Sequence, residues 1–186
     1  LNHLLDSGKE VSTAVDPYRP WTAGYTGAGW VRAFLTAERG GRGDDSVSTM
    51  VDSLETMSVH GRAGGLEGFT VRELDRTLLL VPEREYAATR AQERFLKARS
   101  LGAHLLGQDR TRFILTKTHT PLQQAARAFA AELLAPADVI QGMLTKLGGH
   151  ADPSAFDSIA GQLGVSPLVI QHQYENQIAR RMADSV

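Results

Sequence analysis

The stretch RFLKARSLGAHLL, residues 94–106, constrains the fold more than any other part of the chain. Its apolar residues recur at helical spacing, and no proline interrupts the run. Alanine and leucine also have high helix propensities. We therefore expect a helix that ends at Gly107 and belongs to a longer helical segment beginning near Glu83.

A second stretch, LQQAARAFAAELLAP at residues 122–136, also predicts a helix. Thr120 is a good N-cap residue, and Pro121 suits the first helical position because its missing N–H would have no partner there. Pro136 marks the end of this helix. A further helix is expected at residues 137–147, closed by two glycines.

Together the two stretches resemble the helix pair of the ImmA/IrrE-type metallopeptidases, whose usual wording is close to RFTLAHELGHHLL and ExxANxFAAELLMP. The matching residues of the first helix are Arg94, Phe95, Ala98, Leu101, Gly102, His104, Leu105 and Leu106. Those of the second helix are Ala126, Phe129, Ala130, Ala131, Glu132, Leu133, Leu134 and Pro136.

The positions that carry the chemistry of that family do not match. In HExxH, two histidines one helical turn apart bind zinc, and the glutamate activates the metal-bound water. On this pattern the first histidine falls on Arg99, the glutamate on Ser100 and the second histidine on Ala103. The third metal ligand, a glutamate of the second helix, falls on Gln123, and the family's asparagine falls on Arg127.

These replacements remove the zinc chemistry. Ala103 has no donor atom, Ser100 is no general base without an activating partner, and the neutral amide of Gln123 is a poor zinc ligand. Arg99 would aim a permanent positive charge at the place of a dication. The resemblance therefore implies a non-enzymatic protein without a metal cofactor. Its implied fold is α+β: a mostly helical, zincin-like metallopeptidase fold with a small three-stranded sheet packed on the former active-site helix.

The region ahead of these helices agrees with the order of elements in that family. We expect a helix from Ser46 to about Glu55, a strand at residues 57–62, a hairpin of residues 66–72 and 77–81, and a short strand or extended loop at residues 113–115. In the family a sheet edge lies along the substrate cleft. Such an edge can bind an extended peptide by strand addition, which needs no metal.

Residues 1–44 are expected to be an N-terminal extension of unclear role, ahead of a metallopeptidase-like domain at residues 45–186. The glycine-rich run GGRGDD supplies the boundary. Gly24, Gly27 and Gly29 are expected to loosen the backbone before a helix at residues 30–38.

Residues 157–176 have the pattern of a helix-turn-helix, with the turn at Gly164–Ser166. A similar sequence also forms the C-terminal end of the ImmA/IrrE domain, where it packs as part of the fold. Side chains of the second helix that would suit base or phosphate contacts are Gln171, His172, Gln173, Asn176, Arg180 and Arg181. The sequence leaves packing and DNA reading open, and favours packing because the chain lacks an excess of basic residues.

The composition narrows the class of protein. Hydrophobic residues make up 42% of the chain, enough for a core, and the net charge of −1 does not indicate a nucleic-acid or membrane-surface protein. Without cysteine, disulfides and cysteine-based zinc sites are excluded. No run has the length of a membrane span and the first residues lack signal-peptide character, so a bacterial cytoplasmic protein is expected.

The leading hypothesis is a non-catalytic regulatory module that binds a protein partner, such as a helix-turn-helix repressor or stress regulator, through the former substrate cleft. Candidate contacts are Arg99, His104, His119 and Arg127. For the two arginines, internal ion pairs with Glu93 or Glu132 are the alternative. Two other functions stay open: a zinc metallopeptidase with ligands from His104, His119 and a carboxylate, and a DNA-binding regulator that uses the C-terminal segment.

Overall fold

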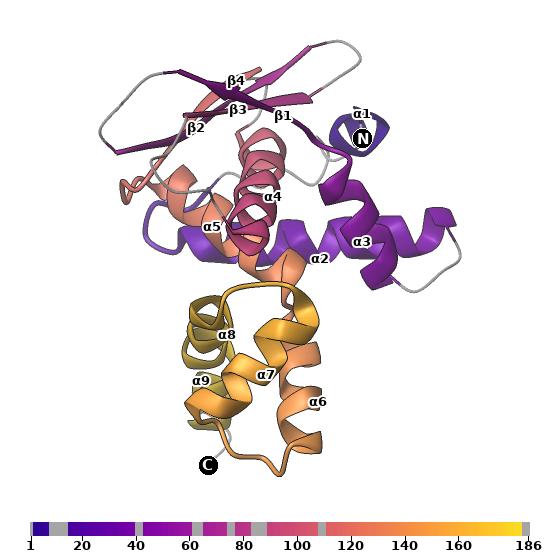
Figure 1. Ribbon diagram of the computed structural model, residues 1–186, viewed down its shortest axis with the longest axis vertical. Helices are drawn as coiled ribbons and strands as arrows, with labels where there is room; N and C mark the ends of the chain where they lie inside the picture. The colour runs from indigo at the N-terminus through magenta and orange to yellow at the C-terminus, as the bar shows by residue number, and fades with distance from the viewer. Residues whose placement is uncertain are drawn as a thin grey trace.

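The computed structural model describes residues 2–7, 15–39, 43–60, 65–73, 77–82, 89–107 and 111–183. Over these residues the fold is α+β and mostly helical, with a small sheet at one end of the molecule (Figure 1). Helix α4 runs beneath the sheet, α2 and α5 cross below it, and α6 to α9 form the opposite end (Figure 1).

The helices in chain order are α1 (Asn2–Ser7), α2 (Pro20–Arg39), α3 (Gly43–Asp52), α4 (Arg90–Leu106), α5 (Pro121–Leu134), α6 (Ala137–Lys146), α7 (Pro153–Leu163), α8 (Pro167–Gln173), the π-helical turn η2 (Tyr174–Ile178) and α9 (Ala179–Ala183). The strands are β1 (Glu55–Val59), β2 (Leu66–Arg72), β3 (Thr77–Pro82) and β4 (Arg112–Thr116).

The described strands form one four-stranded sheet in the order β1-β3-β2-β4. Strands β2 and β3 make the expected antiparallel hairpin, while β1 pairs with β3 in parallel. The expected count of three strands was wrong, because residues 112–116 form a full strand that pairs antiparallel with β2. This pairing joins segments far apart in the chain, so local sequence signals indicate it only weakly.

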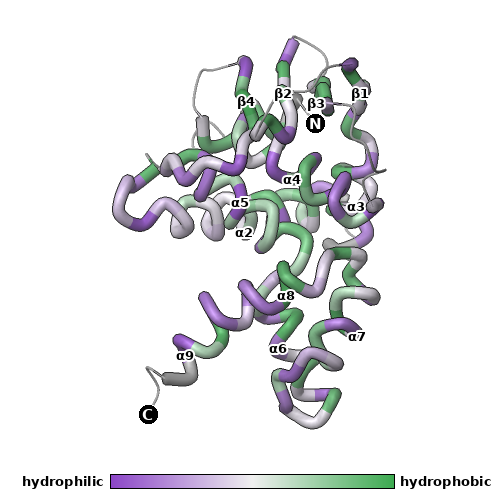
Figure 2. The backbone as a smooth tube through the Cα atoms, turned by 60° about the vertical axis from the view of Figure 1, so that its left-hand side comes forward, coloured by the Kyte–Doolittle hydropathy of each residue, from purple (hydrophilic) through white to green (hydrophobic). Residues whose placement is uncertain are grey.

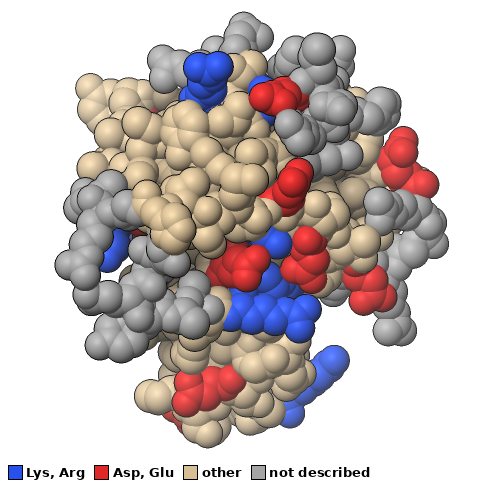
Figure 3. All heavy atoms as spheres, turned by 45° about the horizontal axis from the view of Figure 1, so that its top comes forward, with Lys and Arg blue, Asp and Glu red and all other residues tan. Residues whose placement is uncertain are grey.

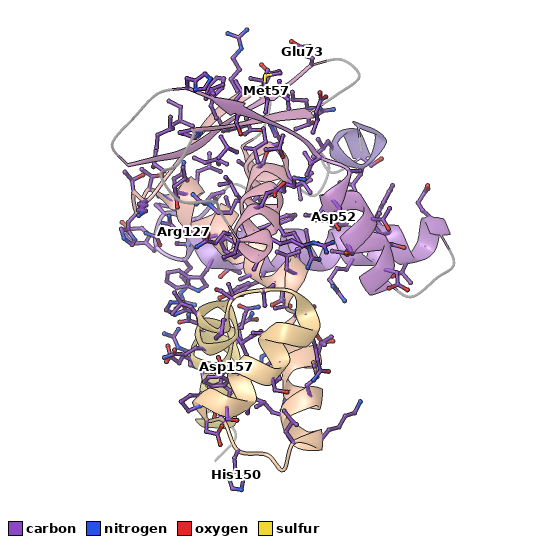
Figure 4. The ribbon with its side chains drawn as sticks, viewed as in Figure 1. Asp52, Met57, Glu73, Arg127, His150 and Asp157 are labelled. Carbon is purple, nitrogen blue, oxygen red and sulfur yellow. The ribbon has the colours of Figure 1, made fainter. Side chains whose placement is uncertain are left out.

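One face of the sheet packs on α4. Leu79, Phe113 and Leu115 form a buried cluster with Leu96 and Ala103 of that helix. The other face carries a row of apolar residues that register pairing places side by side: Met57, Leu80, Phe69 and Ile114. Met57 lies on the side of the sheet away from α4 (Figure 4).

The expectation that Gly24, Gly27 and Gly29 loosen the backbone was wrong. These glycines lie inside one continuous helix, α2. Their role is close packing. A Cβ at Gly24 would overlap the carbonyl oxygen of Ala125 and lie 2.7 Å from the backbone nitrogen of Phe129. A Cβ at Gly27 would touch the Phe129 ring at 3.4 Å. Because these positions lack side chains, α2 approaches α5 more closely than a helix with larger residues there could.

Phe129 is the centre of this helix contact. Its side chain is 1% exposed. On α4, a Cβ at Gly102 would lie 2.7 Å from the Phe129 ring. Hydrophobic segments concentrate where α2, α4 and α5 meet, and the cluster continues into α6, α7 and α8 (Figure 2).

Residues 20–39, which were expected to belong to an extension of unclear role, therefore have a structural role in the core. Val31 and Leu35 of α2 belong to the same buried cluster as Leu101 of α4 and Leu133 of α5. The predicted domain boundary near residue 44 stays a prediction, but α2 forms part of the core.

Some expected bounds shift. Helix α3 begins at Gly43, so Ser46 lies inside it rather than at its cap. Helix α4 begins at Arg90, where Thr89 and Gln92 form a capping box, and residues 83–88 of the expected long helix lie outside the described residues. The caps at Thr120 and Gly107 are confirmed.

None of the described helices combines the length and the apolar character that a membrane span requires.

Replacement of Gly24 with Ala tests the close approach of α2 and α5. The new methyl group would meet backbone atoms, which cannot swing aside, so we expect the free energy of unfolding to fall by at least about 2 kcal/mol. Gly29, on the same helix, has nothing within 4 Å of an added Cβ. Gly29→Ala should therefore raise the stability by about 0.5–1 kcal/mol. Urea unfolding of the two variants, followed by circular dichroism, checks the opposite signs; a similar effect of both would contradict this packing.

Candidate functional site

The four positions that would carry the zinc chemistry are residues 99, 100 and 103 on α4 and residue 123 at the start of α5. Two of their side chains are in direct contact. Arg99 Nη2 donates to Gln123 Oε1 at 2.7 Å. The Arg99 residue is 2% exposed, so its guanidinium occupies the interior between the two helices and the sheet. A cation therefore lies between two positions that the ImmA/IrrE pattern assigns to metal ligands.

The charge of Arg99 is compensated by the sheet. Arg99 Nη1 forms an ion pair with Glu67 Oε2 of β2 at 2.6 Å, and Nη2 also donates to the carbonyl of Thr116 at 2.9 Å. Its Nε finds no hydrogen-bond partner among the described residues. Because a buried guanidinium is costly to leave unpaired, Glu67 carries most of the compensation.

The expected ion-pair partners of the arginines were wrong. Glu93 instead pairs with Lys97 at 3.1 Å, and Glu132 accepts hydrogen bonds from Gln173 at 2.7 Å. Helix geometry explains the error, because Glu93 lies six residues before Arg99 and only residues three or four apart face each other on a helix.

Ser100 belongs to a separate buried chain of polar groups. Ser100 Oγ donates to Thr70 Oγ1 at 2.5 Å, and Thr70 Oγ1 lies 2.9 Å from His104 Nε2. Ser100 and Thr70 are 0% exposed, and the His104 ring makes an edge contact with Phe113. This arrangement fastens α4 to β2, but it presents no nucleophile or base to a substrate because solvent does not reach Ser100.

Gln123 covers the outer edge of β4. Its Nε2 donates to the carbonyl of Ile114 at 2.5 Å, and its Oε1 accepts from the N–H of Thr116 at 3.4 Å. One residue of a parallel strand would make the same pair of contacts. The side-chain amide of Gln123 therefore takes the place of a neighbouring strand at this point.

Arg127 completes the cover of this edge. Its Nη1 donates to the Thr116 carbonyl at 3.3 Å and its Nη2 to the Thr118 carbonyl at 2.7 Å. The outward acceptors of Ile114 and Thr116 are thus already engaged by Gln123, Arg99 and Arg127. An extended peptide cannot pair with β4 there, so the expected strand addition is not available at this edge.

The two guanidiniums produce a local excess of positive charge. Burial lowers the pKa of Arg127, and the nearby Arg99 cation lowers it further, while the Glu67 carboxylate acts in the opposite direction. The Glu67 carboxylate therefore lies near two guanidiniums, those of Arg99 and Arg127. This excess of positive charge attracts an anion and repels any further cation.

The donor set does not fit a zinc ion. The guanidinium of Arg99 is positively charged and would repel a zinc ion. Ala103 packs among apolar side chains, and the amide of Gln123 is hydrogen-bonded to Arg99 and to β4. Among the described residues, no group of three or more His, Cys, Asp or Glu side chains is arranged to hold a metal ion. His104 is buried against Thr70, whereas His119 lies exposed on the loop before α5.

A pocket of about 370 Å³ opens beside this region, between α2, α5 and the α8–η2 segment. Its lining residues are Trp21, Tyr25, Phe95, His119, Gln124, Arg127, Ala128, Ala131, Val169, His172, Gln173, Asn176 and Arg180. Figure 4 shows Arg127 on the flank of the molecule between the sheet and the lower helices. Of the four candidate contacts from the sequence, His119 and Arg127 reach this pocket, while Arg99 and His104 lie in the interior.

Two polar residues of the matching motifs have structural roles. Arg94 Nη1 donates to the carbonyls of Leu163 and Gly164, both at 3.2 Å, and so holds the end of α7 against α4. Glu132 accepts from Gln173 and from Gln177, the latter at 2.6 Å, and ties α5 to α8 and η2. These residues explain why the two helices and the C-terminal segment form one unit.

The C-terminal segment has the expected helix-turn-helix shape, with Gly164 in the left-handed conformation between α7 and α8. Gln173, however, is 2% exposed and bonded to Glu132 and to the Ala135 carbonyl, so it is not available to read bases. On the face shown in Figure 3, acidic and basic side chains lie side by side without a broad patch of one sign.

No pattern in the sequence indicates that Glu67 and Thr116 bind Arg99, or that Thr70 binds Ser100. Glu67 and Thr70 lie on β2, and alternation would place them on opposite faces of the sheet, but a register shift between Leu66 and Gly68 interrupts the alternation and both bond to α4. No protein-family model matches the chain, and neither does any curated protein. The likeness to the ImmA/IrrE helix pair therefore rests on the residues themselves.

The ion pair of Arg99 and Glu67 can be tested by unequal substitutions. Glu67→Gln leaves a buried guanidinium without its anion, and we expect a loss of about 3 kcal/mol in the free energy of unfolding. Arg99→Met removes the buried charge itself and leaves Glu67, whose side chain is 22% exposed, partly hydrated. Its loss should be roughly half as large. Urea unfolding at neutral pH measures both; a larger loss for Arg99→Met would show that Glu67 does not compensate the arginine.

Proposed function

We propose that this protein is a non-catalytic, metallopeptidase-like regulatory module that binds a protein partner, such as a transcriptional regulator. The observation that carries the proposal is the buried guanidinium of Arg99, bonded to Gln123 and paired with Glu67. Two positions that bind zinc in the resembling family are here joined to each other, and their contacts hold the fold together.

The proposal excludes hydrolysis on chemical grounds. Activation of water needs a Lewis acid or a positioned general base. The candidate positions offer a permanently protonated guanidinium, a buried hydroxyl bonded to Thr70, a methyl group and an amide. None of these groups accepts a proton from water near neutral pH.

A zincin-like arrangement is the fold that we propose for residues 45–186. It is supported by the order of α3, the sheet, α4, β4 and α5, and by the sheet cover on α4. It is also supported by the side chains at positions 99 and 123, which converge as two ligands of one ion would.

The partner surface that we propose is the exposed loop between β4 and α5 together with Arg127. His119 is exposed on this loop, and Arg127 is held in position by two backbone carbonyls of the same segment. Arginine side chains that are already fixed lose little conformational entropy when they bind. Arg99 and His104 are buried and are therefore not expected to contact the partner; Arg99 instead binds the Thr116 carbonyl at the start of this loop.

Restoration of the zinc ligands tests the proposed descent of the site. The natural chain should contain no stoichiometric zinc after dialysis, while the variant Arg99→His/Ala103→His/Gln123→Glu should bind about one zinc per chain. Elemental analysis and competition with a zinc indicator measure both. The matched control, Arg99→His/Gln123→Glu, keeps Ala103 and should bind zinc far more weakly because one ligand is missing.

Two results would contradict the proposal. Tightly bound zinc in the natural chain would mean that other side chains form a metal site. A folded triple variant that binds zinc no better than its control would mean that positions 99, 103 and 123 do not converge as ligands. Circular dichroism establishes that each variant is folded before the metal is added.

The partner surface can be tested by quantitative capture from cells of the source organism. We expect the natural chain to retain at least one protein that the His119→Ala/Arg127→Ala variant loses by about tenfold or more, as for other interface arginines. Arg112→Ala removes an exposed arginine of β4 that does not line the pocket and should retain that protein. Equal capture by all three chains would place the partner surface elsewhere.

A further inference from the structure

The pocket between α2, α5 and the α8–η2 segment has properties that partner binding at the neighbouring loop does not require. We propose that it is a binding site for a small organic anion with an apolar ring, a ligand class such as the aromatic carboxylates. This inference does not depend on the proposed function, because it concerns the pocket alone and is tested without a protein partner.

The size and lining of the pocket fit a small molecule. Its volume of about 370 Å³ lies within the range of roughly 300–1,000 Å³ that is typical of small-molecule sites. Trp21, Phe95 and Val169 supply apolar and aromatic surface from three different helices. Trp21 is 38% exposed although it is a large aromatic residue, which leaves its ring available to stack on a ligand.

The charged and ionisable groups of the lining favour an anion. Arg127 and Arg180 line the pocket, and no aspartate or glutamate is among the lining residues, although Glu175 lies 3.8 Å from the lining residue His172. The chain as a whole has a net charge of −1, so the two guanidiniums are a local concentration of positive charge. Electrostatic attraction within a partly enclosed pocket is stronger than on an open surface.

Neither arginine is neutralised by an ion pair within the part of the chain that the structure describes. Arg127 donates to the carbonyls of Thr116 and Thr118, which orient the guanidinium without cancelling its charge. Arg99, the neighbouring cation, is already paired with Glu67. An incoming carboxylate would therefore pair directly with Arg127, which the Glu67 carboxylate influences only from a distance.

Tyr25 adds a phenol to the lining of the pocket. Burial raises its pKa, the Glu132 carboxylate raises it further, and Arg180 acts in the opposite direction. The phenol is consequently neutral at physiological pH and can donate a hydrogen bond to an anion. Ring surface, two guanidiniums and a phenol together define a ligand with one apolar body and one anionic group.

The proposal is tested with 2-naphthoate as the probe and the neutral 2-naphthamide as its matched control. The readout is quenching of Trp21 fluorescence in a Trp30→Phe background, because Trp21 and Trp30 are the two tryptophans of the chain. Isothermal titration calorimetry provides a second measurement. We expect saturable binding of 2-naphthoate, with binding of the amide at least about tenfold weaker because it cannot pair with arginine.

Three variants locate the binding. Arg127→Ala and Arg180→Ala should each weaken 2-naphthoate binding by about tenfold while leaving the weak binding of the amide unchanged. Asn176→Trp, which fills the pocket from an exposed position, should abolish the binding of both probes. Arg112→Ala should bind as the natural chain does.

Absence of saturable binding of 2-naphthoate up to 5 mM, in a chain shown to be folded, would overturn the proposal. Equal affinities for 2-naphthoate and 2-naphthamide would also overturn it, because the pocket would then select for apolar surface alone. Binding that survives both Arg180→Ala and Asn176→Trp would place the anion at another site and overturn it as well. Arg180 and Asn176 are exposed, so these variants keep the test decisive if Arg127→Ala fails to fold.

Discussion

The central constraint of this structure is the need to compensate one buried positive charge. The Arg99 guanidinium lies between α4, α5 and the sheet, and each of these elements contributes to its neutralisation: Gln123 from α5, Glu67 from β2 and the Thr116 carbonyl at the end of β4. Burial of a charge is tolerated where a counter-ion and further hydrogen bonds compensate it. The same contacts therefore fix the start of α5 and hold the last strand in place.

A second constraint acts on the other side of α5. Phe129 fills the space between three helices, and it fits because α2 and α4 present glycines to it. The matching residues of the two motif helices thus divide into groups with different roles. Phe129 and Gly102 determine how closely the helices approach, whereas Arg94 and Glu132 bind the carbonyls and amides of the C-terminal helices. The C-terminal segment consequently packs as part of the fold, in agreement with the interpretation that the sequence favoured.

Local signals in the sequence predicted the helices whose caps are explicit, including Thr120 with Pro121 and Gly107, and the hairpin of β2 and β3. They failed where a residue's role depends on contacts made far along the chain. The glycines of α2 suggested a loose backbone because nothing local reveals that Ala125 and Phe129 approach them. For the same reason the sequence identified Arg99 as a position of interest but not Glu67 as its partner, since strand register decides which carboxylate reaches the guanidinium. The pocket escaped prediction entirely, because its lining comes from residues between 21 and 180.

The amide that lies along β4 has a consequence for the assembly of this sheet. An open sheet has two borders, and each offers unpaired backbone groups to any extended chain in solution. Gln123, Arg99 and Arg127 engage the carbonyls of Ile114 and Thr116 on one border, so an extended chain cannot pair with those groups. Among the described strands, β1 forms the opposite border, so an added strand would pair there rather than at Ile114 and Thr116. The side chains at positions 99, 123 and 127 therefore also limit edge-to-edge association at this border of the sheet.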